Sequence, residues 1–271
     1  MSNLFRLIVF ASLAVWITAC QAAPEIPVTD GAVQAQVTPE AVPPVSTPLM
    51  GQGSVVPPVE LAFKRAEESS ADPRYSIDLR YPYLTGEGSS AIAAFNQQVE
   101  TLVFGMVGSF KQDLERSSSD PSFNQWPSQL SVDFIPTYLA PDTAAVLIKI
   151  SAFLPGAAHP GHISHAINYN LREGKGIDLP ELFLPGAGYL DILSAYCIED
   201  LRARGSLQWE EGVQPRAENF NVWNLTPEGL LITFDEYRVA PYAAGPQSVL
   251  VPYDRLRDVA NPQGPIGSLI P

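Results

Sequence analysis

The chain is divided by the sequence GAAHPGHISHAINYNLREGKGIDLPELF, residues 156–183, which holds all three histidines, His159, His162 and His165. Apolar and polar residues alternate over 163–170, and this period of two predicts a half-buried strand. A Gly-Lys-Gly turn follows at 174–176, and then an amphipathic Leu-Pro-Glu-Leu-Phe step. We therefore expect residues before this stretch to form part of a sheet, and residues after it to complete that sheet.

The part of the chain before this stretch alternates between strand and helix patterns. Residues 75–81 read YSIDLRY, a half-buried strand that we expect Pro82 to end. Residues 91–114 carry apolar side chains at steps of three and four, which predicts a long amphipathic helix. Residues 130–139 and 144–154 read as two strands joined by a short turn, and so as an antiparallel hairpin.

The part after this stretch repeats the same alternation. A helix is predicted at 187–204, an irregular aromatic loop at 237–246 and a frayed tail at 261–271. Short strands are predicted at 220–225, 230–234 and 248–252, followed by a helical turn at 253–259. The order β-α-β-β-β-α-β-β-β predicts an α+β fold, with antiparallel sheet and helices packed on one face.

The charge balance limits the classes of partner. The formal net charge is −13. A surface with this charge repels phosphate backbones, so we do not expect nucleic-acid binding. A cationic partner would be attracted at long range. The acidity is also explained by solubility alone.

The N-terminus has the pattern of an export signal. Residues 1–20 carry one arginine, an apolar run and the tetrad Ile-Thr-Ala-Cys, which is typical of a bacterial lipoprotein signal. We expect Cys20 to be acylated, by palmitate among other chains, and to anchor the protein to a membrane. The alternative is an ordinary signal peptide cleaved after Ala19 or Ala23. Residues 21–58 are rich in proline and lack periodicity, which predicts a disordered tether.

Cys197 is the second of two cysteines. Acylation of Cys20 would leave Cys197 without a disulfide partner. It lies in an apolar helical pattern, which favours a buried and inert thiol over a reactive nucleophile.

The motifs from Gly156 to Tyr253 support a family resemblance. They are a Gly-Ala-His turn, a strand with paired Tyr and Asn, a Gly-x-x-Ile-x-Leu-x-x-Leu-Phe step and a Tyr-x-x-Ala-Pro-Tyr-Ala-x-Gly loop. The corresponding segments are residues 156–159, 167–170, 176–183 and 237–245. This order resembles the extracytoplasmic RsiV-type domain, which is shared by the lysozyme-sensing anti-sigma factor and some peptidoglycan deacetylases.

The resemblance implies a division of the chain and a kind of function. Residues 59–154 would form a small β-α-β-β module, and residues 155–260 the RsiV-type C-terminal domain. No transmembrane helix and no deacetylase motifs are expected, so the implied protein is an ectodomain on a lipid anchor. It would bind a ligand in the bacterial envelope, namely peptidoglycan fragments or a cationic protein such as lysozyme. A cell-wall hydrolase and a structural or assembly lipoprotein are the alternatives, and whether the protein is an enzyme stays open.

Four residues are candidates for ligand contact, and the histidines raise a separate metal hypothesis. Tyr237 and Tyr242 offer flat amphipathic rings for sugar or protein, although Tyr242 is equally suited to plugging the end of the sheet. His159 in its turn and Tyr169 on its strand complete the set. The spacing His-x-x-His-x-x-His invites a metal, but Pro160 and Gly161 prevent the helix that would align the rings. We therefore predict no metal and no cofactor.

Overall fold

The computed structural model describes residues 39–41, 59–86, 90–117 and 126–271. These residues form two sheets and three α-helices, so the predicted α+β class is confirmed. The elements of the first sheet and its helix are β1 (Pro39–Ala41), β2 (Glu60–Ala71), β3 (Arg74–Thr85), α1 (Ser90–Ser117), β4 (Ser128–Ala140), β5 (Thr143–Phe153), β6 (Gly161–Asn170) and β7 (Lys175–Gly176). The second sheet and its helices are α2 (Tyr189–Ala203), β8 (Trp223–Leu225), β9 (Gly229–Phe234), β10 (Gln247–Pro252) and α3 (Tyr253–Leu256).

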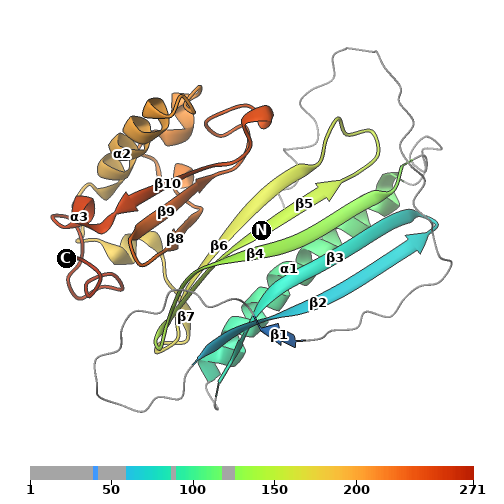
Figure 1. Cartoon of the computed structure of the whole chain (residues 1–271), viewed down its shortest axis with the longest axis horizontal. Helices are drawn as coiled ribbons and strands as arrows, with labels where there is room; N and C mark the ends of the chain where they lie inside the picture. Colours follow the sequence, from blue (N-terminus) through green and yellow to red (C-terminus); the bar gives the residue numbers. More distant parts are fainter. Residues whose placement is uncertain (1–38, 42–58, 87–89, 118–125) are drawn as a thin grey trace.

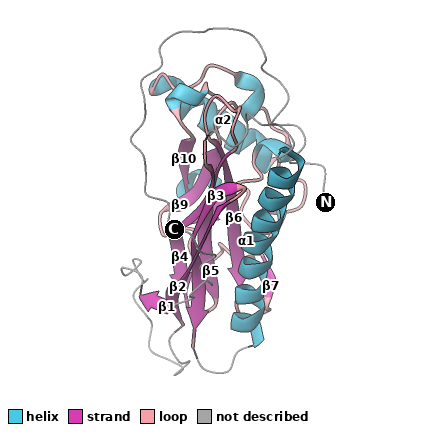
Figure 2. Ribbon diagram, turned by 90° about the vertical axis from the view of Figure 1, so that its right-hand side faces the viewer, coloured by secondary structure: helices cyan, strands magenta, loops and turns pink. Residues whose placement is uncertain are grey.

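The first sheet has seven strands in sequence order, and α1 lies along one of its faces (Figures 1 and 2). The pairs are antiparallel except β3 with β4, which run parallel because α1 crosses over between them. The apolar stripe of α1 supplies the fully buried Phe95 and Val99 to this core. Opposite them, the alternating positions Val146 and Ile148 of β5 face the helix side.

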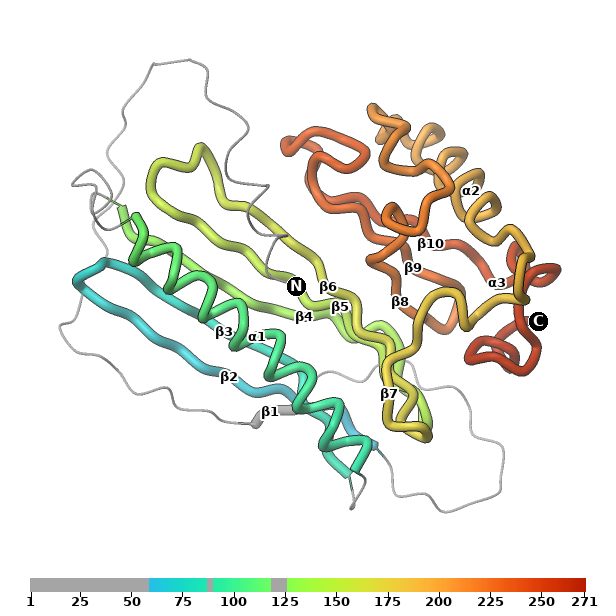
Figure 3. The backbone as a smooth tube through the Cα atoms, turned by 180° about the vertical axis from the view of Figure 1, so that it is seen from behind, coloured from blue at the N-terminus to red at the C-terminus, as the bar shows by residue number. Residues whose placement is uncertain are grey.

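The second sheet has three antiparallel strands in the order β10-β9-β8 and lies between α2 and the first sheet (Figures 1 and 3). Its core includes Leu193, Cys197 and Leu201 from α2, all fully buried. Ala145 of β5 also packs into this core. The first sheet therefore contributes one face to each of two apolar cores.

Polar side chains join the two sheets. Asn168 of β6 donates to the Trp223 carbonyl at 2.7 Å and accepts from the Leu225 amide at 2.9 Å. Asn224 of β8 donates to the Val146 carbonyl at 3.0 Å. The two Asn168 bonds satisfy backbone groups that β8 would otherwise bury without a partner.

Three details differ from the sequence predictions. Strand β2 was not predicted, although it pairs with β3 along its whole length. Pro82 does not end β3, because β4 pairs with β3 only as far as Leu79 and a proline is tolerated beside an unpaired edge. Residues 261–271 are not frayed: they fold back in turns, because the apolar Ile266 is fully buried in the second core.

The expected boundary at residues 154/155 assigns β6 and β7 to the C-terminal part of the chain. In the structure both strands pair into the first sheet. The division into two folding parts stays a prediction. The predicted signal at 1–20 and Cys20 lie outside the described residues, as does most of the tether at 21–58, of which 39–41 form β1.

Candidate functional site

The candidate site begins with the loop between β9 and β10, which reaches the start of β6 (Figure 1). Tyr237 occupies the left-handed region with φ of 64°, where a non-glycine residue is uncommon. Its amide donates to the Ala240 carbonyl at 2.9 Å, which closes a tight turn. Val239 and Ala240 are buried beneath this turn, and Tyr237 itself is 58% exposed. The backbone is thus bent in a way that holds a large ring out in solvent.

Five aromatic or imidazole rings gather around this loop, and we call them the ring cluster. The His159 ring stacks on Tyr242 with centroids 3.6 Å apart, and its Nε2 lies 3.1 Å from the Tyr237 hydroxyl. His162 stacks on the same Tyr242 at 5.8 Å, and Trp209 on Tyr237 at 6.4 Å. The interplanar angles of the stacked pairs lie between 15° and 29°. The result is a set of nearly parallel rings drawn from three distant parts of the sequence.

Two acidic side chains fix the cluster to β6. The Ser164 amide donates to Asp235 Oδ2 at 3.1 Å, and His162 Nδ1 lies 2.8 Å from Glu236 Oε1. The Glu236 side chain is only 7% exposed, so the contact with His162 is largely shielded from solvent. Asp235 Oδ1 is buried, and no described residue offers it a hydrogen bond. The site therefore has acidic groups at its base and rings at its surface.

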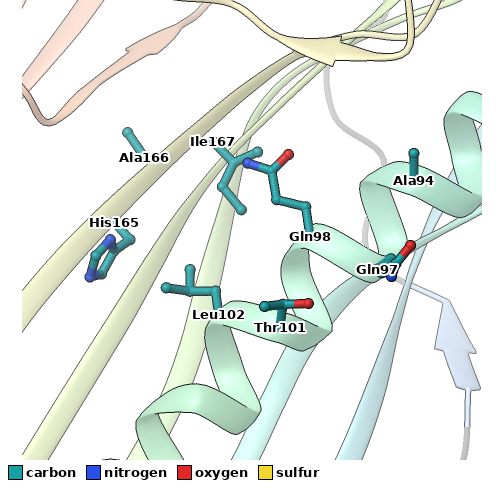
Figure 4. Close-up of a pocket in the computed structure, with 8 residues that line it drawn as sticks. All are labelled: Ala94, Gln97, Gln98, Thr101, Leu102, His165, Ala166 and Ile167. Atoms are coloured by element: carbon teal, nitrogen blue, oxygen red, sulfur yellow. The ribbon is translucent and has the colours of Figure 1, made fainter. Parts of the chain in front are cut away.

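His165 lies away from the ring cluster, on the side of β6 that faces α1 (Figure 4). Burial lowers the pKa of His165, and the carboxylate of Asp235 partly opposes that shift. The three histidines are thus divided between two surfaces. His159 and His162 share Tyr242, whereas His165 lines a different surface. Among the residues that the structure describes, no group of three or more His, Cys, Asp or Glu side chains is placed to hold a metal.

Tyr169 also lies apart from the other three predicted ligand residues. It is 3% exposed, its ring packs edge-on against Phe95 at 5.5 Å, and its hydroxyl donates to the Gly174 carbonyl at 2.7 Å. A tyrosine with a buried ring and a satisfied hydroxyl serves the core. The structure brings together His159, Tyr237 and Tyr242, and leaves Tyr169 in the interior.

Sequence reasoning did not single out Trp209 as a site residue. Trp209 stands between α2 and β8 without a periodic pattern around it, and its amide donates to the Val239 carbonyl at 3.1 Å. That bond places it beside the aromatic loop. Only the side-by-side position of the two loops reveals the residue, and no local motif in the sequence predicts that position.

Cys197 is fully buried in α2, and burial raises the pKa of its thiol to about 12. This agrees with the prediction of an inert thiol. No described helix has the length and apolar character needed to cross a membrane.

Comparison with known proteins finds a family match within the C-terminal part of the chain. Residues 180–254 match the family described as "Protein of unknown function (DUF3298)". A stretch of 141 residues is 26% identical to the peptidoglycan-N-acetylmuramic acid deacetylase PdaC of Bacillus subtilis (strain 168). This match covers 50% of the chain but only 30% of the relative, so the chain spans under a third of that enzyme's length.

Solved structures share the fold. A DUF3298 family member from Bacteroides fragilis covers 78% of the chain with a TM-score of 0.62 and 15% identity, and 97% of that structure is covered. A DUF3298 family protein from Pseudomonas aeruginosa PAO1 covers 79% with a TM-score of 0.53 and 16% identity, again with 97% of it covered. The predicted RsiV-type resemblance is supported by these matches, of which the family match covers residues 180–254.

Proposed function

We propose that this chain is a ligand-binding protein of the bacterial cell envelope, anchored by lipid at Cys20, whose ring cluster binds glycan fragments of peptidoglycan. The observation that carries the proposal is the set of parallel rings around Tyr237 and Tyr242, held at the surface by a left-handed turn. Backbone strain of this kind gathers at functional sites.

The chemistry of the cluster suits a sugar. A ring with an apolar face and a polar tip packs against the C–H face of a pyranose and donates or accepts at its hydroxyls. The cluster offers such faces on Tyr237 and Trp209, which are 58% and 37% exposed. Near them, the imidazole of His162 and the carboxylate of Glu236 provide polar groups for orientation.

The comparisons support the class of ligand. The matched relative is by name an enzyme of peptidoglycan, and part of it is similar to half of this chain. We extend from that relative only the setting, which is the cell wall, and not its deacetylase activity. The same setting supports an extracytoplasmic location for this chain.

A cationic protein such as lysozyme is the second candidate ligand. The net charge of −13 favours it, because such a charge raises the encounter rate with a basic partner at low salt. The two candidates differ in one measurable respect: binding of a neutral muropeptide should not depend on ionic strength, whereas binding of lysozyme should weaken steeply with added salt.

Calorimetric titration of the full chain with purified muropeptides, and separately with lysozyme, tests the ligand. Tyr237→Ala and Trp209→Ala should each weaken binding at least tenfold, since aromatic anchors dominate such sites. Trp126→Ala is the matched control, because Trp126 is 52% exposed and lies outside the ring cluster. Heat from neither ligand would reject this ligand set. Turnover of the muropeptides would instead indicate the hydrolase alternative.

Mass spectrometry of the protein purified from bacterial membranes tests the anchor. A diacylated or triacylated N-terminal cysteine at position 20 is expected, with partition into detergent, and Cys20→Ser should abolish both. An unmodified mature N-terminus at another residue would reject lipid anchoring. Crosslinking in cells to one envelope protein, without any small-ligand binding, would favour the assembly alternative.

A further inference from the structure

Strand β6 has one edge paired with β5 and one edge that faces outward. The direction of its backbone groups follows from three hydrogen bonds. The Leu171 amide, just past β6, donates to the Asp142 carbonyl. The backbone N–H and C=O groups of odd-numbered residues in β6 therefore point toward β5. The Ser164 amide donates to Asp235, and the Asn168 carbonyl accepts from the Ile177 amide. The backbone N–H and C=O groups of even-numbered residues therefore point outward, away from β5.

In the described part of the chain, the outward edge has no neighbouring strand over a short and defined length. Strand β7 pairs only with Tyr169 and Asn170, and Asp235 bonds only the amide of Ser164. Four groups remain, namely the Ser164 carbonyl, both backbone groups of Ala166 and the Asn168 amide. Within the described residues none of the four has a hydrogen-bond partner. They extend over about five residues, or roughly 13 Å of strand.

A groove of about 520 Å³ runs beside this edge, with α1 as its other wall (Figure 4). Figure 4 shows Gln98 of α1 pointing toward Ile167 of β6. The lining contains no Asp, Glu, Lys or Arg, and consists of Ala94, Gln97, Gln98, Thr101, Leu102, His165, Ala166 and Ile167. A strand edge beside a helix is the geometry in which domains capture an extended peptide by adding it to a sheet.

The opposite edge of the same sheet already accepts such an addition from the chain itself. Residues 39–41 pair antiparallel with β2 as strand β1. That segment is therefore engaged away from β6. The remainder of residues 21–58 is a poor candidate for β6, because its frequent prolines lack the amide that an added strand must donate.

We propose that the open edge of β6, from Ser164 to Asn168, docks an extended segment of another protein as an added strand. The row of two donors and two acceptors is complementary to a peptide backbone and to no charged group. The side chains of the partner that enter the groove are apolar or carry amides, since the lining holds Leu102, Ile167 and two glutamines without a fixed charge. This surface is separate from the ring cluster, and the proposal does not depend on the glycan ligand.

The test begins with selection of phage-displayed random heptapeptides on the full chain. The enriched peptide, made synthetically, should slow hydrogen exchange at the Ala166 and Asn168 amides at least tenfold, and leave the amide of Ile167, which faces β5, unchanged. N-methylation of the peptide amides that point toward β6 should weaken binding at least tenfold. N-methylation of the intervening amides, which point away from β6, should have little effect, because the backbone groups of a strand alternate in direction.

Gln98→Trp should fill the groove and weaken the same peptide at least tenfold. Gln112→Trp is the matched control, because it adds the same ring at an exposed position of α1 outside the groove. No enriched peptide, or binding that leaves Ala166 exchange unchanged, overturns the proposal. So does a dimer in sedimentation that Gln98→Trp dissociates, because the occupant would then be a second copy of the chain.

Discussion

Replacement of Tyr237 by glycine and by alanine tests the strained turn on which the ring cluster depends. Both changes remove the ring and its contacts with Trp209, His159 and Tyr242. Tyr237 is 58% exposed, so about 42% of the residue is covered. For a side chain of about 200 Å² this is about 80 Å², or about 2 kcal/mol of stability lost in either variant.

The difference between the two variants isolates the backbone. At φ of 64° alanine carries the left-handed cost of about 1–2 kcal/mol, which glycine avoids. Glycine loses about 0.5–1 kcal/mol through the greater freedom of its unfolded chain. We therefore expect Tyr237→Gly to be more stable than Tyr237→Ala, by roughly 0.5–1 kcal/mol.

Urea unfolding followed by circular dichroism measures the difference, with Tyr242 as the control in the same loop. Tyr242 lacks a positive φ, so there alanine should be the more stable replacement, by about 0.5–1 kcal/mol. The sign should thus reverse between two tyrosines five residues apart. Equal signs at both positions would refute the left-handed turn, and with it the argument that strain holds the ring outward.

Three further predictions concern the body of the fold. Asn168→Ala should lower the free energy of unfolding by about 2–5 kcal/mol, because it leaves the buried Trp223 carbonyl and Leu225 amide without partners. Thermal and urea unfolding measure this loss, and a loss under about 1 kcal/mol would mean that β8 finds other partners. Burial lowers the pKa of His165 in the folded state, so the neutral imidazole contributes stability above pH 6.5 that should be lost as the pH falls below this value. A His165→Gln variant should lack this loss of unfolding free energy between pH 6.5 and 5. An identical pH profile in the two proteins would contradict the burial argument. Cys197, with a pKa of about 12 against an ordinary 9, should hold about a thousandfold less thiolate at pH 8, and a disulfide reagent should label it only after unfolding.

The sequence predicts the fold well where one face of an element is apolar. The stripe of α1 and the alternation of β4 to β6 follow directly from burial of one side, and the structure buries Phe95, Val132 and Ile148 as expected. Strand β2 escaped prediction because its sequence, ELAFKRAEESSA, alternates weakly and is rich in charge. A strand near the edge of a sheet needs few apolar residues, so its pattern carries little signal.

The candidate site could be predicted only in part, because it forms from separate segments. His159, Tyr237 and Tyr242 were found through motifs, although 78 residues separate His159 from Tyr237. Trp209 and Glu236 carry no such motif, and their roles depend on how the second sheet sits on the first. Tyr169 shares its strand with His162 and His165, but its pairing with β7 and its contact with Phe95 direct it inward.

Asp235 connects the two surfaces that this structure presents for binding. Its carboxylate ends the open edge of β6 at Ser164, and the next two residues supply Glu236 and Tyr237 to the ring cluster. Both surfaces therefore depend on the same junction, at which Asp235 and Glu236 make directional polar contacts with β6 beside the shared apolar core. Directional bonds tolerate little displacement, because their strength falls steeply with misalignment. A change that shifts the second sheet should consequently alter the shape of both surfaces together, whereas a change within α1 should alter the groove alone.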